Sequence, residues 1–491
     1  MMPPPHREPI YSNMTANALY LLKGSLVTSG SLFVMNLILA RAFTPLDLSW
    51  IFIVMSVTGI SMVIAEVGIP QAVTVKLSER ISKGISYQGV GDISSVVISS
   101  FSSGMIMAII FALGLFFISD LIPFSQGSNV IAGALKISSL WVLFSSFLKI
   151  SQGVFNGFQK MKYSFFLNTL VEPLKFLLVI GALLFGLNWR ELIWGWTFTY
   201  FLSFVFCAAL LFLFFNKERI DLNFGAPQCK KEILIQGLLL HSPILGYFLI
   251  PYTLNLILAR HGVGEVSYFA LSLSLTSIYF VLFNAFSFAF LPAATQLMVQ
   301  EDKERLANIV IVGTKYIGLG GFVILLIFYF FSDKILGVLY GSQYVRGEQV
   351  LKLLAFGVFF DIFKTIYDPL LMGTRHGGFV TIVEWIKFGM VLLFGSIAIE
   401  RFGLLGTGLT FFVSFLAATS LKIFFIQRYL SIELFKPMIG MGCLVGGLLL
   451  YHFLKIPFII IILIWAVAVY YFKLWVWREV KYIWSLIRYA S

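Results

Sequence analysis

Fourteen long apolar runs follow one another along the 491 residues, separated by short polar or charged stretches. A helix needs roughly 20 mainly apolar residues to cross the hydrocarbon core of a bilayer. Lipid offers no hydrogen bonds to bare backbone, and the runs are far longer than barrel strands, so each predicts a spanning helix. The runs cover residues 17–40, 49–72, 93–118, 131–153, 164–187, 192–215, 233–258, 266–291, 309–331, 348–371, 378–399, 405–427, 437–454 and 457–473.

Composition agrees with this pattern. Hydrophobic residues make up 59% of the chain, charged residues 12%, and the mean hydropathy is +0.93, which excludes a water-soluble globule. We therefore expect an all-α polytopic membrane protein with about 14 transmembrane helices. The opening stretch, MMPPPHREP, does not resemble a cleaved signal peptide. The three cysteines lack metal-type spacing, so neither a metal site nor a disulfide framework is indicated.

The net charge of +12 is distributed unevenly between the predicted loops. With both termini on the cytoplasmic side, the inner segments carry more lysine and arginine than the outer loops, as the positive-inside rule requires. This predicts a multi-pass protein of the cytoplasmic (inner) membrane with cytoplasmic termini, whose positive charge faces anionic membrane lipids. No nucleic-acid partner is needed to explain the charge.

Similar segments recur at nearly constant spacing and indicate an internal duplication. They are residues 36–41 (NLILAR) and 255–260 (NLILAR), residues 171–176 (VEPLKF) and 383–388 (VEWIKF), and, more weakly, Lys149 and Lys364. Each pair links a helix to the sixth helix after it, so both copies cross the membrane in the same sense as parallel repeats. The expected units are an N-lobe (1–215, helices 1–6), a cytoplasmic linker (216–232), a C-lobe (233–427, helices 7–12), and helices 13–14 with a basic tail (428–491).

Ionisable residues inside the predicted spans are the main functional clue. Each costs about 2.5–3.5 kcal/mol near a helix centre, so those present are expected to face a wet cavity or a partner. Glu172 and Lys175 lie three residues apart on one helix face, and Glu384 and Lys387 repeat this arrangement in the second copy. Two facing lobes are then expected to line one cavity with the lysines and carboxylates Lys149, Lys175, Lys364, Lys387, Glu66, Glu172, Asp361, Asp368 and Glu384.

Simpler interpretations stay open for these and other polar residues. A Glu/Lys pair three residues apart can simply neutralise itself within a helix bundle. Arg41 and Arg260 are expected to anchor the outer interface or to gate the mouth of the cavity. His241, two residues before Pro243, is interpreted as a local irregularity rather than as a ligand. The side chains of five lysines nearer helix ends are expected to reach the headgroups: Lys23, Lys136, Lys315, Lys352 and Lys422.

No catalytic or nucleotide-binding motif is present. The sequence lacks G-x-x-x-x-G-K-[ST], H-E-x-x-H and G-x-S-x-G, so neither an ATPase nor a hydrolase is indicated. The loops leave no room for a soluble catalytic domain. We therefore expect a secondary transporter without a cofactor, energised by an ion gradient of H⁺ or Na⁺ or by the substrate's own gradient.

Three loop motifs resemble one known family: Leu39-Ala40-Arg41 with Phe43-Thr44-Pro45-Leu46-Asp47, Val338-Leu339-Tyr340-Gly341-Ser342-Gln343-Tyr344, and Phe402-Gly403-Leu404-Leu405-Gly406-Thr407-Gly408. With them the chain resembles the multidrug/oligosaccharidyl-lipid/polysaccharide (MOP) exporter superfamily, and within it the polysaccharide transporters that include Wzx-type O-antigen flippases. The resemblance implies a V-shaped pair of six-helix lobes and alternating access. It also implies export of a polyprenyl-diphosphate-linked oligosaccharide, in contact with a glycan polymerase or other biosynthetic complex.

Alternatives to a glycan flippase remain at this point. Within the superfamily, a lipid II flippase is favoured by helices 13 and 14, and a cation-coupled drug exporter is disfavoured by the basic residues. A membrane-embedded glycan polymerase or ligase is a different class, and the long outer loop with paired basic residues expected of it is lacking.

Overall fold

The structure, a computed structural model, describes residues 27–82, 90–121, 128–218, 220, 229–300, 302–454 and 457–476. In this part of the chain nearly all residues are helical and none forms a strand. Ten of its helices are long and apolar enough to span a membrane, and three shorter apolar helices accompany them. The predicted all-α polytopic fold is confirmed. The start of predicted helix 1, with Lys23, most of the linker and the tail from residue 477 lie outside the described residues.

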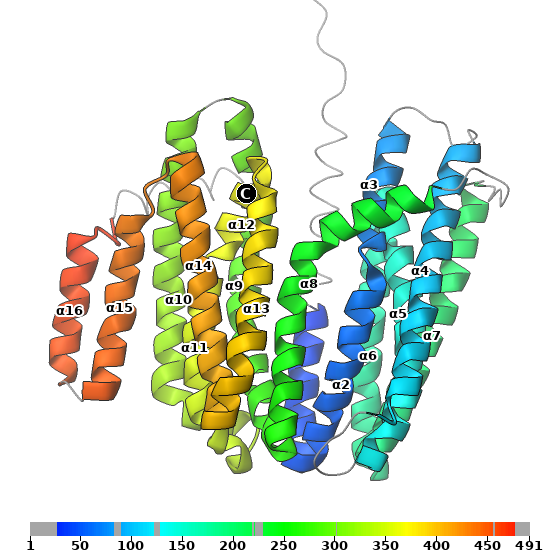
Figure 1. The fold of residues 1–491 in the computed structure, drawn as a ribbon, viewed down its shortest axis with the longest axis horizontal. Coiled ribbons are helices and arrows are strands. Elements are labelled where there is room, and N and C mark those ends of the chain that lie inside the picture. The colour runs from blue at the N-terminus through cyan, green and yellow to red at the C-terminus, as the bar shows by residue number, and fades with distance from the viewer. Residues whose placement is uncertain are drawn as a thin grey trace, which may run out of the picture. The chain divides into compact units, whose positions relative to one another are not determined.

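The chain forms two compact units, Met1–Leu271 and Ser272–Ser491. In unit 1, α5 packs against α2, α3, α4, α6 and α7, and α8 packs against α2 and α3. The lobes expected from the duplication divide the chain differently, because they assign α8 to the second copy. These lobe boundaries remain a prediction. After the helix Val27–Ala42, the elements of unit 1 are α2 (Pro45–Glu66), α3 (Ile69–Ser82), α4 (Val90–Ile118), α5 (Ser128–Gly157), α6 (Met161–Phe185), α7 (Trp189–Lys217), α8 (Lys230–His261) and η1 (Val263–Glu265) (Figure 1).

Unit 2 begins within α9, and its α14 packs against α11 and α13. The pair α15 and α16 joins this bundle through α10: the rings of Trp465 and Phe322 meet edge to face at 5.2 Å. The loop expected at 292–308 is largely helical, since α9 and α10 are separated by only a few residues. The elements are α9 (Val266–Val299), α10 (Lys303–Leu339), η2 (Ser342–Gly347), α11 (Glu348–Asp361), α12 (Lys364–Gly373), α13 (Gly377–Phe402), α14 (Leu404–Leu430), α15 (Phe435–Leu454) and α16 (Phe458–Tyr471).

The second predicted helix is not continuous but is interrupted near its end. Val67 and Gly68 adopt left-handed backbone conformations, with φ of 44° and 70°, between α2 and α3. The chain then resumes as a helix to Ser82, so the loop expected from residue 73 is wrong for its first ten residues. A left-handed β-branched residue is rare and strained, and such strain persists only where surrounding contacts enforce it. Here the contact is with α8, whose Gly237 packs directly on Gly68.

Replacing Gly68 with alanine is therefore expected to destabilise the protein by about 1–3 kcal/mol. The new Cβ would lie 2.0 Å from the carbonyl oxygen of Gly237, on a backbone with positive φ. Thermal unfolding of the purified protein in detergent measures the effect. Gly114→Ala, in α4 with open space around its Cβ position, is the matched control. Equal melting temperatures for the two variants would contradict this packing.

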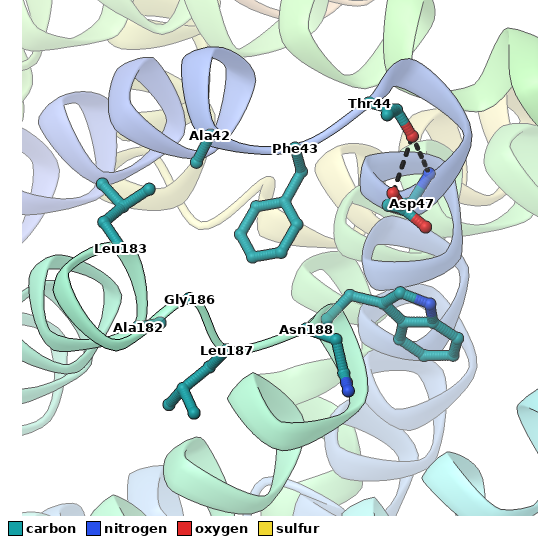
Figure 2. Close-up of a pocket in the computed structure, with 10 residues that line it drawn as sticks. Ala42, Phe43, Thr44, Asp47, Ala182, Leu183, Gly186, Leu187 and Asn188 are labelled. Carbon is teal, nitrogen blue, oxygen red and sulfur yellow. Dashed lines mark hydrogen bonds between the residues drawn. The ribbon is translucent and has the colours of Figure 1, made fainter.

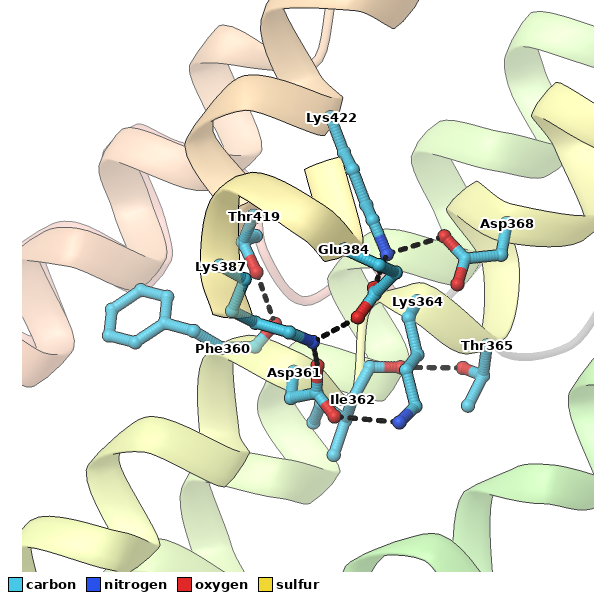
Figure 3. A network of polar contacts seen from close by, with 10 residues as sticks. All are labelled: Phe360, Asp361, Ile362, Lys364, Thr365, Asp368, Glu384, Lys387, Thr419 and Lys422. Carbon is cyan, nitrogen blue, oxygen red and sulfur yellow. Dashed lines mark hydrogen bonds and ion pairs between the residues drawn. The ribbon is translucent and has the colours of Figure 1, made fainter. Parts of the chain in front are cut away.

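The predicted helix 348–371 is also interrupted, at Ile362 and Phe363, between α11 and α12. The amides of the next residues bond only three positions back: Thr365 to Ile362 at 3.1 Å, and Ile366 to Phe363 at 3.1 Å. Two threonine hydroxyls bond carbonyls at the interruption: Thr419 donates to Phe360 at 2.8 Å and Thr365 to Ile362 at 2.7 Å (Figure 3). The break lies between two charged residues, Asp361 and Lys364.

Candidate functional site

Six charged side chains of unit 2 form one connected network around this break (Figure 3). Asp361 ends α11, Lys364 and Asp368 come from α12, Glu384 and Lys387 from α13, and Lys422 from α14. The nitrogen-to-oxygen distances are 2.8 Å for Lys364–Asp361, 3.6 Å for Lys387–Asp361, 2.6 Å for Lys387–Glu384, 2.6 Å for Lys422–Asp368 and 2.9 Å for Lys422–Glu384.

The network balances three ammonium groups against three carboxylates. The Lys387 side chain is completely buried, with its ammonium 4.3 Å from the ring centroid of Phe415, and Glu384 and Lys422 are almost as buried. Lys364, whose ammonium lies 4.2 Å from the centroid of Phe280, retains 19% exposure of its side chain. Paired and buried charges of this kind orient helices, and removing one partner is costly.

Lys422 belongs to this network, contrary to the prediction. Its side chain was expected to reach the headgroups, but it is buried between Glu384 and Asp368. A signal was present, because the predicted intramembrane charges of the second copy contained three carboxylates and only two lysines. Lys315 is buried as well, and Lys352 pairs with Glu348, so neither matches a simple headgroup contact.

Unit 1 holds a smaller polar cluster around Lys175 of α6. The ammonium of Lys175 lies 3.0 Å from a carboxylate oxygen of Glu172 and donates to the hydroxyl of Tyr200 at 3.0 Å. Its aromatic surroundings come from α5 and α7: the ring centroid of Tyr200 is 4.6 Å away, and Trp141 stacks on Tyr200 at 5.6 Å. Lys175 is only 6% exposed, whereas the Glu172 side chain is 19% exposed.

Two further residues belong to the same region. Tyr252 of α8 lies within electrostatic range of Lys175, Glu172 and Glu66, so we group Glu66, at the end of α2, with this region. With two carboxylates and one ammonium, this unit 1 cluster carries one more negative than positive charge. Neither Tyr200 nor Tyr252 was predicted, since aromatic residues are too common in this chain, at 17%, to point to a site.

Lys149 differs from the other predicted lysines. It is exposed, and it makes no hydrogen bond or ion pair with any described residue. It also lies on the inward face of α5. The residues four and seven positions before it, Ser145 and Val142, and the residue four positions after it, Gly153, share this face, and all three are buried. Leu140, nine residues or about two and a half turns earlier, is exposed on the opposite face. The exposed surface of Lys149 therefore belongs to the interior side of the helix.

The two predicted arginines lie at helix ends and are exposed: Arg41 at the end of the helix Val27–Ala42, and Arg260 in the last turn of α8.

Beyond Arg41 is a pocket of about 350 Å³ between residues 42–47 and 182–189 (Figure 2). Its polar groups serve as helix caps: Thr44 accepts from the amide of Asp47, and Asn188 begins a capping box. We assign this pocket no ligand.

Each of the two units groups its own share of the duplication-related residues. Lys175 and Glu172 lie in the unit 1 cluster, and Lys364, Lys387 and the other unit 2 carboxylates form the unit 2 network. The common cavity remains a prediction. Among the described residues, no three or more His, Cys, Asp and Glu side chains are grouped as metal ligands.

Comparisons with known proteins give the fold and the family. The profile of the polysaccharide biosynthesis proteins matches residues 38–347, more than half of the chain. No curated protein matches the sequence significantly.

Three solved structures illustrate the fold. An inward-facing multidrug resistance MATE family transporter of the MOP superfamily is 14% identical, with a TM-score of 0.68, over 84% of this chain and 94% of that one. The lipid II flippase MurJ in an inward closed conformation is 13% identical, with a TM-score of 0.64, over 94% of this chain and 98% of that one. A MOP superfamily transporter from Pyrococcus furiosus is 14% identical, with a TM-score of 0.56, over 84% and 95%.

The profile match and these folds agree with each other and with the loop motifs. The chain belongs to the polysaccharide biosynthesis protein family, and it shares its fold with transporters of the MOP superfamily.

Proposed function

We propose that the chain is a flippase for a polyprenyl-diphosphate-linked oligosaccharide, an O-antigen or similar surface glycan repeat unit. It carries the lipid from the cytoplasmic to the outer leaflet of the inner membrane by alternating access. Family membership supports the connection to polysaccharide synthesis. A diphosphate with attached sugars cannot cross hydrocarbon unaided, so its export requires a protein that offers polar and positively charged partners inside the membrane.

The observation that carries this proposal is Lys149. An ammonium group within a spanning helix that has no counter-ion among the described residues, and that is exposed on the interior face, is suited to receive an anion. Lys364, which is partly exposed and pairs with Asp361, is a second phosphate contact in this proposal. Lys175 and Lys387 then act indirectly, because both are almost fully buried and paired.

The extra carboxylate of the unit 1 cluster is assigned to coupling. Glu66 and Glu172 retain some exposure, and together they exceed the single positive charge of Lys175. Binding of H⁺ or Na⁺ to Glu66 would neutralise the cluster, so entry and release of the cation can accompany the two states of transport. In the unit 2 network the charges balance without an added cation. We therefore assign coupling to Glu66 rather than to Asp361, Asp368 or Glu384.

A lipid II flippase is the second candidate. The similarity to MurJ covers 94% of this chain, against 84% for the MATE transporter of comparable TM-score. A drug exporter fits less well, because Lys149 and Lys364 would repel a cationic drug. The biosynthetic enzymes of the glycan, including its polymerase, are the proposed partners, with both termini of the flippase in the cytoplasm.

Complementation tests the substrate class. We expect the full chain to restore surface glycan in a strain that lacks its polyprenyl-diphosphate oligosaccharide flippase, measured by glycan staining of extracted lipid or surface polymer. It should not support growth of a strain depleted of its lipid II flippase. Rescue of the second strain alone would contradict the proposal and select the lipid II alternative. A Lys149→Ala variant present in the membrane at equal abundance is the control: it should restore less glycan if rescue depends on transport.

A further inference from the structure

His241 connects α8 to both sides of the break between α2 and α3. Its imidazole is 2% exposed. Nε2 lies 3.1 Å from the carbonyl oxygen of Val63, in the last turn of α2, and Nδ1 lies 3.4 Å from the side-chain nitrogen of Gln71, in the first turn of α3. One buried ring therefore contacts both half-helices.

The partners determine the chemistry of the ring. A carbonyl can only accept, so Nε2 carries the proton and donates to Val63, and Nδ1 accepts from the amide of Gln71. In a continuous helix the Val63 carbonyl would receive the amide of Val67, but that amide bonds to Ile64 at 3.3 Å. His241 thus supplies the donor that the interruption removes from the backbone.

The same part of α8 also contacts the strained backbone between α2 and α3. Gly237, four residues before His241, packs on Gly68, next to the left-handed Val67. Pro243, two residues after it, lies inside α8, which is bent in Figure 1. A proline inside a helix removes one backbone hydrogen bond and kinks the helix. The break in one helix and the bent helix beside it are therefore joined by His241.

Glu66 is the residue directly before this break, and its carboxylate makes no hydrogen bond or ion pair with a described residue. We infer that His241 is a positioning residue that stabilises the break between α2 and α3 and so holds Glu66 in the unit 1 cluster. This inference rests on the proposed function in one respect, the role of Glu66 in coupling. The stabilisation of the break does not depend on it.

Amide hydrogen exchange of the purified full chain tests the stabilisation. Peptides that cover Val67–Ala72 should exchange about tenfold faster in His241→Ala, because a buried carbonyl loses its partner. His241→Gln, whose amide nitrogen can reach Val63, should restore the protection to within about threefold. His261→Ala, at the exposed end of the same helix, is the control and should match wild type. Unchanged exchange in His241→Ala would overturn the inference.

Transport in proteoliposomes tests the link to Glu66, with H241A, E66Q and the double variant compared under an imposed ion gradient. H241A should lower the maximal rate about tenfold in the wild-type background and add no further loss to E66Q. H241Q should recover most of the rate. An equal loss in both backgrounds would overturn the positioning role. A wild-type rate in E66Q would remove Glu66 from the proposed mechanism, and the exchange experiment would still decide the stabilisation.

Discussion

Replacing Lys387 with methionine is expected to lower the stability of the protein by about 3–5 kcal/mol. Lys387 is completely buried, and its ammonium is shared by Glu384 at 2.6 Å and Asp361 at 3.6 Å. Without it, two buried carboxylates lose a directly paired cation. Thermal unfolding in detergent, followed by intrinsic fluorescence, measures the change.

Two further variants separate charge imbalance from lost packing. Lys387→Met combined with Glu384→Gln leaves two lysines and two carboxylates, so it should be more stable than Lys387→Met alone. Lys364→Met removes a partly exposed charge that pairs with Asp361, and it should cost less. A wild-type melting temperature for Lys387→Met would contradict the structural role of the network. The transport defect of Lys387 variants is thus expected to follow their loss of folded protein.

The spanning helices were predictable because bilayer thickness fixes their length. Predicted spans such as 164–187 and 405–427 correspond to α6 and α14, Met161–Phe185 and Leu404–Leu430, within a few residues. The residues of the charged pairs were predictable because charges inside apolar runs are rare. Lys175 and Lys387 each bind the carboxylate three residues before them.

The helix interruptions were not predictable from the sequence. Valine strongly disfavours a left-handed conformation, so nothing local to Val67 indicates a break. The break depends on α8, which brings Gly237 and His241 to it from about 170 residues later in the chain. The exposure of these lysines could not be predicted from the sequence either. Lys149 and Lys422 both lie within predicted spans, and only helix packing makes one exposed and the other buried.

Replacing Lys149 with alanine is expected to reduce transport strongly without unfolding the protein. A charge-assisted hydrogen bond to a phosphate contributes about 1.5–3 kcal/mol, which corresponds to roughly a 10- to 100-fold loss in rate at low substrate. Folding should be preserved, because Lys149 has no ion pair or hydrogen bond with a described residue to lose. Lys149→Arg keeps the charge and should retain most of the activity.

Lys136→Ala is the matched control for this variant. Lys136 lies on the same helix, α5, and forms an exposed pair with Asp120 at 2.7 Å. Exposed pairs contribute about 0–1 kcal/mol, so this variant should transport and melt like wild type. A deficit in Lys136→Ala as large as that in Lys149→Ala would show that α5 tolerates no loss of charge anywhere, and would remove the specific role of Lys149.

Movement of a labelled polyprenyl-diphosphate oligosaccharide across the membrane of proteoliposomes is the decisive measurement, with the label on the far leaflet detected by a membrane-impermeant quencher. Wild-type protein should move the lipid faster than protein-free vesicles, and Lys149→Ala should be slower by at least tenfold. Wild-type rates equal to those of empty vesicles, or equal rates in wild type and Lys149→Ala, would contradict diphosphate recognition by this interior lysine.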